Sequence, residues 1–119
     1  MKTHQYELID EKVFEHEFDN GLKLFIIPKP GFQKTYVTYT TQFGSLDNHF
    51  KPIGSQQFVK VPDGVAHFLE HKLFEKEDED LFTAFAEENA QANAFTSFDR
   101  TSYLFSATSN IESNIKRLL

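Results

Sequence analysis

Near the middle of the chain two histidines and a glutamate stand close together, as His67, Glu70 and His71. In an α-helix successive side chains are about 100° apart, so these three side chains would share one side of the helix. Imidazoles four residues apart can both reach one divalent cation, and neutral histidine suits zinc. The carboxylate beside them can take a proton from an activated water and pass it to a leaving amine. The spacing H-x-x-E-H therefore predicts a hydrolytic metal site.

The helix expected to carry this motif runs from Val65 to Phe74. Four apolar residues lie on its opposite side, Val65, Phe68, Leu69 and Leu73. We expect that side to be buried. Chance alone would produce the motif only about 0.02 times in a chain of this composition. The chain has no cysteine, so any metal must be held by histidine and carboxylate.

Three strands are expected before this helix. Residues 12–18 and 22–27 alternate or are rich in branched side chains, and Asn20-Gly21 between them is typical of a hairpin turn. Residues 34–43 have the Thr, Tyr and Val content of a third strand. Asp63, just before the helix, is expected to act as its N-cap or first-turn acid.

Loops and a linker separate these elements from the rest. Residues 44–57 are polar and turn-forming, which indicates a surface loop. The acidic run at residues 75–80 is expected to be a solvated linker that caps the next helix rather than a cation site.

A second helix is expected at residues 81–89, with Leu81, Phe82 and Phe85 inward. Residues 92–98 and 101–107 then predict two strands, and a last amphipathic helix begins at Asn110. Its apolar residues are Ile111, Ile115, Leu118 and Leu119. The predicted class is α+β, an antiparallel sheet with helices packed on one face.

Composition limits the class of protein further. The 119 residues include 12 basic and 18 acidic side chains, and the net charge of -6 argues against a nucleic-acid partner. The 14 phenylalanines indicate a core built on Phe rings. The N-terminus lacks the apolar run of a signal peptide, and no apolar stretch of about 18 residues occurs. We expect a soluble, cytoplasmic protein without membrane insertion.

Several segments together resemble the pitrilysin family of inverted-zincin metallopeptidases, which includes insulin-degrading enzyme and the mitochondrial processing peptidase. Residues 64–74 resemble the motif helix of that family. Asn93 to Ser97 and Arg100 to Tyr103 resemble the strand pair that follows it. Asn20-Gly21-Leu22 and Gly44-Ser45 resemble parts of its opening hairpin and third strand.

The resemblance implies a zinc endopeptidase in which His67 and His71 are zinc ligands and Glu70 is the general base. Phe74 would line the substrate pocket. The strand residues Ala92, Asn93, Ala94 and Phe95 would pair with an extended peptide substrate. For Asn93 the alternative is an ordinary turn residue.

The resemblance also implies a third zinc ligand, a Glu roughly seventy residues past the motif, beyond Leu119. Other candidates are expected to be surface residues: His4, His16, His49, Glu87, Glu88 and Glu112. Residues 1–119 are therefore expected to be a single, truncated, N-terminal part of a zinc peptidase domain, inactive alone.

Members of this family close over the substrate with a second homologous half or subunit, so a homodimer or heterodimer is implied. A non-catalytic subunit that binds peptides or supports a partner is the alternative function. A third possibility is a small metal-binding module complete in itself.

Overall fold

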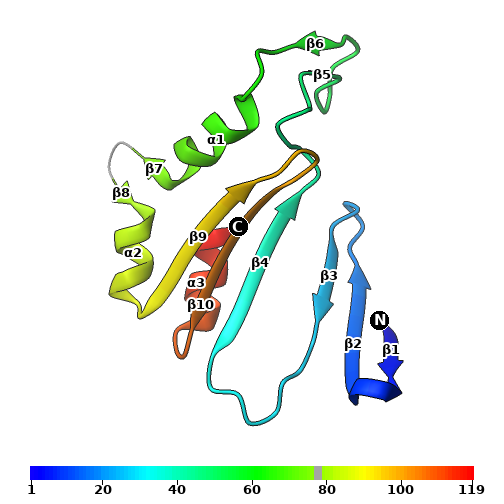
Figure 1. The fold of residues 1–119 in the computed structure, drawn as a ribbon, viewed down its shortest axis with the longest axis vertical. Helices are drawn as coiled ribbons and strands as arrows, with labels where there is room; N and C mark the ends of the chain where they lie inside the picture. Colours follow the sequence, from blue (N-terminus) through cyan, green and yellow to red (C-terminus); the bar gives the residue numbers. More distant parts are fainter. Residues whose placement is uncertain (77–78) are drawn as a thin grey trace. The chain divides into compact units, whose positions relative to one another are not determined.

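The computed structural model describes residues 1–76 and 79–119, and the chain divides into two compact units, Met1–Phe32 and Gln33–Leu119 (Figure 1). The first unit is an antiparallel sheet of β1 (Lys2–Tyr6), β2 (Glu11–Glu17) and β3 (Lys23–Ile26), in that order. A 3-10 helix, η1 (Glu7–Ile9), joins β1 to β2. The predicted hairpin is therefore confirmed. The first strand was not predicted, because its five exposed residues show no apolar alternation.

The second unit is built on a three-stranded antiparallel sheet in the order β4-β10-β9. Its strands are β4 (Thr35–Thr41), β9 (Ala90–Thr96) and β10 (Thr101–Ala107). Its helices are α1 (Val65–Phe74), α2 (Leu81–Glu87) and α3 (Ile111–Leu118). Two short ribbons complete it, β5 (His49–Phe50) with β6 (Val59–Lys60), and β7 (Glu75–Lys76) with β8 (Glu79–Asp80). Among the described residues, no helix has the length and apolar character needed to span a bilayer.

One face of the three-stranded sheet carries the core of the second unit. Along β10 the buried residues Tyr103, Phe105 and Ala107 alternate toward this face, and Phe105 is 0% exposed. The register places Val37 of β4 and Ala92 of β9 on either side of Phe105. Because side chains alternate between the two faces of a strand, these residues together form one apolar layer.

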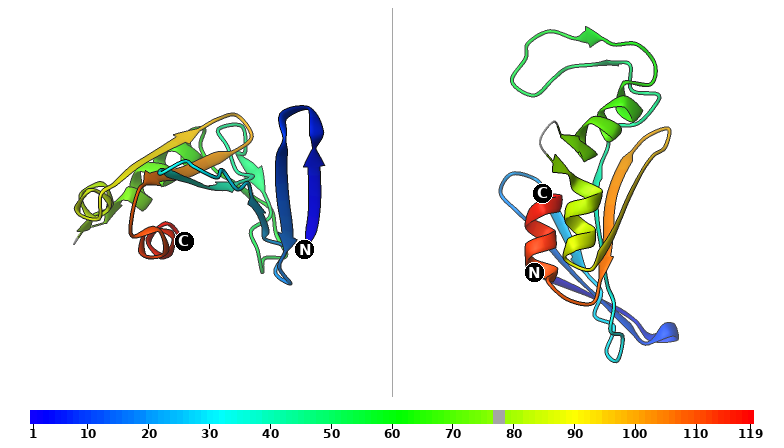
Figure 2. Two further views of the ribbon diagram at one scale, coloured as in Figure 1. Left: turned by 90° about the horizontal axis from the view of Figure 1, so that it is seen from below. Right: turned by 90° about the vertical axis from the view of Figure 1, so that its left-hand side faces the viewer.

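All three helices pack on this same face, and Figure 2 shows α2 and α3 lying against it. Phe85 of α2 stacks on Phe105 with ring centroids 5.6 Å apart, and Phe74 of α1 stacks on Tyr103 at 5.7 Å. α3 contributes Ile111 and other partly buried apolar residues. The predicted class, α+β with helices on one face of an antiparallel sheet, is confirmed.

Phenylalanine supplies less of the core than its abundance suggested. Phe74, Phe85 and Phe105 are buried, whereas many other Phe rings are exposed. Phe82 was predicted to point inward but is 44% exposed, since its ring stacks on the outer side of Phe74 at 4.5 Å. Ala84 is buried on α2 instead.

The ends of the helices follow the predictions in part. Asp80 caps α2 by accepting a hydrogen bond from the Phe82 amide at 3.0 Å, as the acidic linker predicted; residues 77–78 of that linker lie outside the described part. The prediction for Asp63 is wrong. The N-cap of α1 is Gly64, at a φ of 87° that favours glycine, and Asp63 instead accepts a hydrogen bond from Asn48 at 2.9 Å.

The predicted burial of the apolar side of α1 is also wrong in this structure. Phe68, Leu69 and Leu73 are 60%, 43% and 51% exposed. The buried residues of α1 are Ala66 and Phe74. These lie two turns apart on the side of Glu70, so this side of the helix contacts the sheet.

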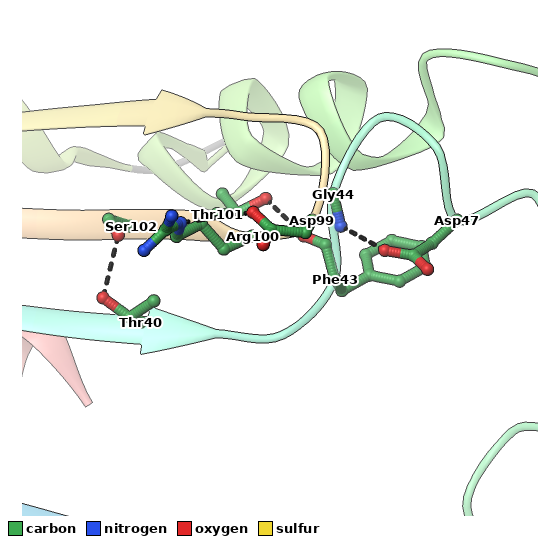
Figure 3. Close-up of polar contacts among 8 residues, drawn as sticks. All are labelled: Thr40, Phe43, Gly44, Asp47, Asp99, Arg100, Thr101 and Ser102. Atoms are coloured by element: carbon green, nitrogen blue, oxygen red, sulfur yellow. Dashed lines mark hydrogen bonds and ion pairs between the residues drawn. The ribbon is translucent and has the colours of Figure 1, made fainter.

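Gly44 stands where the chain leaving β4 crosses the turn between β9 and β10 (Figure 3). A Cβ placed on Gly44 would lie 2.5 Å from the backbone of both Phe98 and Arg100. The Gly44 amide also donates to the carboxylate of Asp47 at 2.7 Å. Glycine is therefore needed here for a close approach of two backbones.

We predict that Gly44→Ala lowers the free energy of unfolding by about 1–3 kcal/mol, because the crowded backbones must move apart. Urea denaturation followed by circular dichroism measures the change. Ser45→Ala is the matched control, since the Ser45 amide keeps its hydrogen bond to the Ser97 carbonyl at 2.9 Å. Equal stability of Gly44→Ala and the wild type would contradict the close approach.

Candidate metal and peptide site

The two motif histidines bring their distal nitrogens together on the exposed side of α1. Nε2 of His67 lies 2.9 Å from Nε2 of His71. Two nitrogens bound to a tetrahedral zinc at 2.0–2.1 Å would lie about 3.3 Å apart. The pair is thus spaced for two ligands of one small cation, and a slight opening of the rings would admit zinc.

Glu70 points toward the sheet rather than into the gap between the imidazoles. Its Oε2 accepts a hydrogen bond from Oγ1 of Thr96, the last residue of β9, at 2.6 Å. Burial raises the pKa of the nearby Tyr103 phenol, and the negative charge of Glu70 raises this pKa further. The carboxylate is therefore anchored between the motif helix and two strands.

Within residues 1–76 and 79–119, no three His, Asp or Glu side chains form a group that could hold a metal ion. Glu70 is therefore not grouped with the histidine pair as a third ligand among these residues.

Five of the six other candidate side chains named from the sequence have contacts of their own. His4 pairs with Glu15 at 2.8 Å, and Glu112 pairs with Lys116 at 2.7 Å. Glu88 pairs with Arg117, and the rings of His16 and His49 pack against Phe18 and Phe58. None of these side chains approaches the motif pair in a metal-binding group among the described residues.

β9 forms one edge of its sheet in the described part of the chain, since its paired neighbour is β10. The Ser97 amide donates to the Arg100 carbonyl at 2.8 Å, so Ser97 and Arg100 are a hydrogen-bonded pair. This pair determines which residues of β9 bond to β10. Hydrogen-bonded and non-bonded pairs alternate in antiparallel sheets. The amides and carbonyls of Ala92, Ala94 and Thr96 therefore point away from β10, toward the open edge.

The side chain of Asn93 covers one of these edge groups, because its Oδ1 accepts a hydrogen bond from the Ala94 amide at 2.8 Å. Asn93 and Phe95 lie on the face of the sheet opposite the helices, and both are exposed. The strand predicted to bind substrate thus offers backbone groups at Ala92 and Ala94 and side chains at Asn93 and Phe95. Their roles in binding stay predictions.

Phe74 was predicted to line a substrate pocket, and its side chain is buried. It is 4% exposed and packs between Phe82 and Tyr103 in the core. This position gives it a packing role, and its predicted place in a substrate pocket rests on the family resemblance alone.

Thr96 and Tyr103 were not identified as site residues from the sequence. The only indication was their position in segments that resemble the family strands, since a threonine or tyrosine in a strand is otherwise ordinary.

We predict that Glu70→Gln lowers the pKa of Tyr103, because removing a nearby negative charge favours the phenolate. The pKa should stay above the ordinary value of about 10, since burial is the larger cause of the shift. Ultraviolet absorbance of the phenolate, compared with the Tyr103→Phe variant, measures it. An unchanged pKa would show that Glu70 does not lie beside Tyr103.

Comparison with known proteins identifies the family of this chain. Residues 52–117 match the insulinase family, peptidase family M16. The chain is 53% identical over all 119 residues to YmfH of Bacillus subtilis, described as an uncharacterized zinc protease, and covers 28% of that protein. It is 33% identical over 96 residues to mouse insulin-degrading enzyme, covering 75% of this chain and 8% of that enzyme.

A solved structure of an M16-like peptidase from Alicyclobacillus acidocaldarius superposes with a TM-score of 0.81 and 39% identity, covering 91% of this chain and 25% of that one. The chain spans about a quarter of the length of the bacterial relatives. With the family match extending over more than half of its residues, the chain belongs to the insulinase family, peptidase family M16.

Proposed function

We propose that the protein containing this chain is a zinc endopeptidase that hydrolyses extended peptides, with His67 and His71 as zinc ligands and Glu70 as general base. One observation carries the proposal. The convergent imidazole pair and a carboxylate anchored to the open edge strand occur on the same helix, 2.9 Å between the nitrogens and 2.6 Å from Glu70 to Thr96.

Each side chain has a distinct task in this reaction. Zinc, when bound, supplies a Lewis acid that polarises the attacking water and the scissile carbonyl. His67 and His71 would hold the cation through their Nε2 atoms. Glu70 accepts the proton of the attacking water and returns it to the leaving nitrogen, so one water is consumed and two peptide ends are released.

The open edge of β9 supports a peptide substrate in an extended conformation. Ala92 and Ala94 offer main-chain donors and acceptors that another strand can pair with. Such pairing contacts the peptide backbone rather than the peptide side chains. We therefore expect β9 to orient the substrate, with little selection for the amino-acid sequence of the substrate. The Asn93 side chain has to release the Ala94 amide before the peptide can use it.

The rest of the longer protein completes the site in this proposal. Catalytic zinc generally has three protein ligands and a water, and the third ligand would be a Glu contributed beyond this chain. A second homologous half or subunit would close over the substrate. Residues 1–119 alone would then hydrolyse little or no peptide.

A non-catalytic, peptide-binding subunit is the alternative within the same family. The complete H-x-x-E-H motif and the anchored Glu70 favour the enzyme.

In the full-length protein, Glu70→Gln should lower kcat at least about a hundredfold, because a positioned base contributes roughly 10²–10⁴ to the rate. Zinc content should stay near one per site, since the imidazole pair is intact. Peptide cleavage by mass spectrometry and metal analysis check both. Cleavage at the wild-type rate would exclude Glu70 as the base, and no cleavage by zinc-loaded wild type would favour the non-catalytic subunit.

The His67→Ala variant should lose zinc as well as activity, in contrast to Glu70→Gln. A chelator should abolish wild-type cleavage, and added zinc should restore it. Retention of stoichiometric zinc by His67→Ala would contradict the ligand assignment.

Ala94→Pro should raise KM for a peptide about two- to tenfold, because it removes one main-chain donor at the open edge, worth about 0.5–1.5 kcal/mol. Proline is tolerated at such outward positions of edge strands. Ala94→Val is the control, since it adds similar bulk and keeps the amide. If both variants bind peptide equally well, the edge of β9 is not the binding site.

A further inference from the structure

The hydroxyl of Thr96 is hydrogen-bonded to a side chain of another element, Glu70 of α1. Thr96 closes β9 on the helix side of the sheet, directly across from Thr101 of β10. Its Oγ1 donates to Oε2 of Glu70 at 2.6 Å, the shortest range for a hydroxyl bound to a carboxylate. An ionised carboxylate can only accept, so the hydroxyl is the donor.

This hydrogen bond occupies one oxygen of Glu70 and leaves the other without a hydrogen-bond partner among the described residues. A glutamate on a helix has three side-chain torsions and several accessible rotamers. The bond to Thr96 selects one of them, and Phe74 one turn further along α1 is buried in the core and holds the helix itself. The hydrogen bond and the packing of Phe74 together fix the direction of the Glu70 carboxylate relative to β9.

The same residue belongs to the strand that presents its backbone to a peptide. The amide and carbonyl of Thr96 point to the open edge of β9, as the hydrogen-bonded pair of Ser97 and Arg100 requires. Thr96 therefore connects the Glu70 carboxylate to the open edge of β9 within a single residue. A shift of β9 relative to α1 would move the base and the peptide register together.

We propose that Thr96 is a positioning residue: its hydroxyl orients the Glu70 carboxylate relative to a peptide bound on β9. The inference rests on the proposed peptidase function and deepens it. Thr96 does not touch the reacting atoms, so its effect should fall on kcat rather than on peptide or metal binding. An orientation error near the reacting atoms costs up to about a hundredfold in rate.

The test uses the full-length, zinc-loaded protein and three variants. Thr96→Val keeps the shape and removes the hydroxyl. Thr96→Ser restores a hydroxyl on a smaller side chain. Thr101→Val is the matched control, because the Thr101 hydroxyl donates to the Phe43 carbonyl at 2.7 Å instead of to Glu70 (Figure 3).

Thr96→Val should lower kcat about tenfold to a hundredfold, while KM and zinc affinity stay within about twofold of the wild type. Thr96→Ser should recover most of the wild-type rate. Thr101→Val should keep the wild-type rate at temperatures at which this variant is folded. Wild-type kcat in Thr96→Val overturns the inference. So does a loss of kcat accompanied by loss of zinc, or a Thr96→Ser variant as slow as Thr96→Val.

A second measurement does not depend on activity. In the metal-free protein, a double-mutant cycle of Thr96→Val and Glu70→Ala should show coupling in the urea midpoint of unfolding, because each change removes the same hydrogen bond. Additive effects would overturn the inference even if the wild type cleaves no peptide. An inactive wild type with clear coupling would reject the proposed peptidase function and leave the contact itself established.

Discussion

The rotation of α1 about its own axis is fixed by the burial of Phe74, and the place of every functional side chain on that helix follows from it. Phe74 stacks between Phe82 and Tyr103, and Ala66 lies two turns earlier on the same side. Glu70 lies between them and so faces the sheet, where its carboxylate accepts a hydrogen bond from Thr96. The two imidazoles then fall beside this contact line, exposed and close to each other.

The second unit combines a packed core with an exposed strand edge and an exposed histidine pair. The sheet and helices supply a packed layer around Phe105 that resists displacement. The open edge of β9 and the histidine pair are exposed, so both are accessible to a peptide of the kind that we propose as substrate. Gly44 allows the chain after β4 to cross the β9–β10 turn closely, so the end of β9 that carries Thr96 is held near its partner strand.

The elements and the motif could be predicted from the sequence because their patterns are local. The Asn20-Gly21 turn, the branched residues of β4 and the spacing of His67 to His71 each depend on a few neighbouring residues. α1 has the predicted bounds for the same reason.

Other features depend on tertiary contacts and could not be predicted in this way. The polar strand β1 forms by pairing with β2 and shows no apolar pattern of its own. The apolar residues Phe68, Leu69 and Leu73 indicated the wrong buried side of α1, since periodicity shows that a face is apolar but not which partner covers it. The contact of Thr96 with Glu70 joins residues 26 positions apart, and no local rule relates them.

We propose that α1 holds zinc with His67 and His71 while Glu70 stays outside the ligand set. A zinc-loaded crystal structure of the full-length protein, with the metal located by anomalous scattering, tests it most directly. We expect zinc at about 2.0–2.1 Å from Nε2 of both His67 and His71, with Glu70 outside the ligand set and hydrogen-bonded to Thr96. Zinc held elsewhere, or coordinated by Glu70, would contradict it.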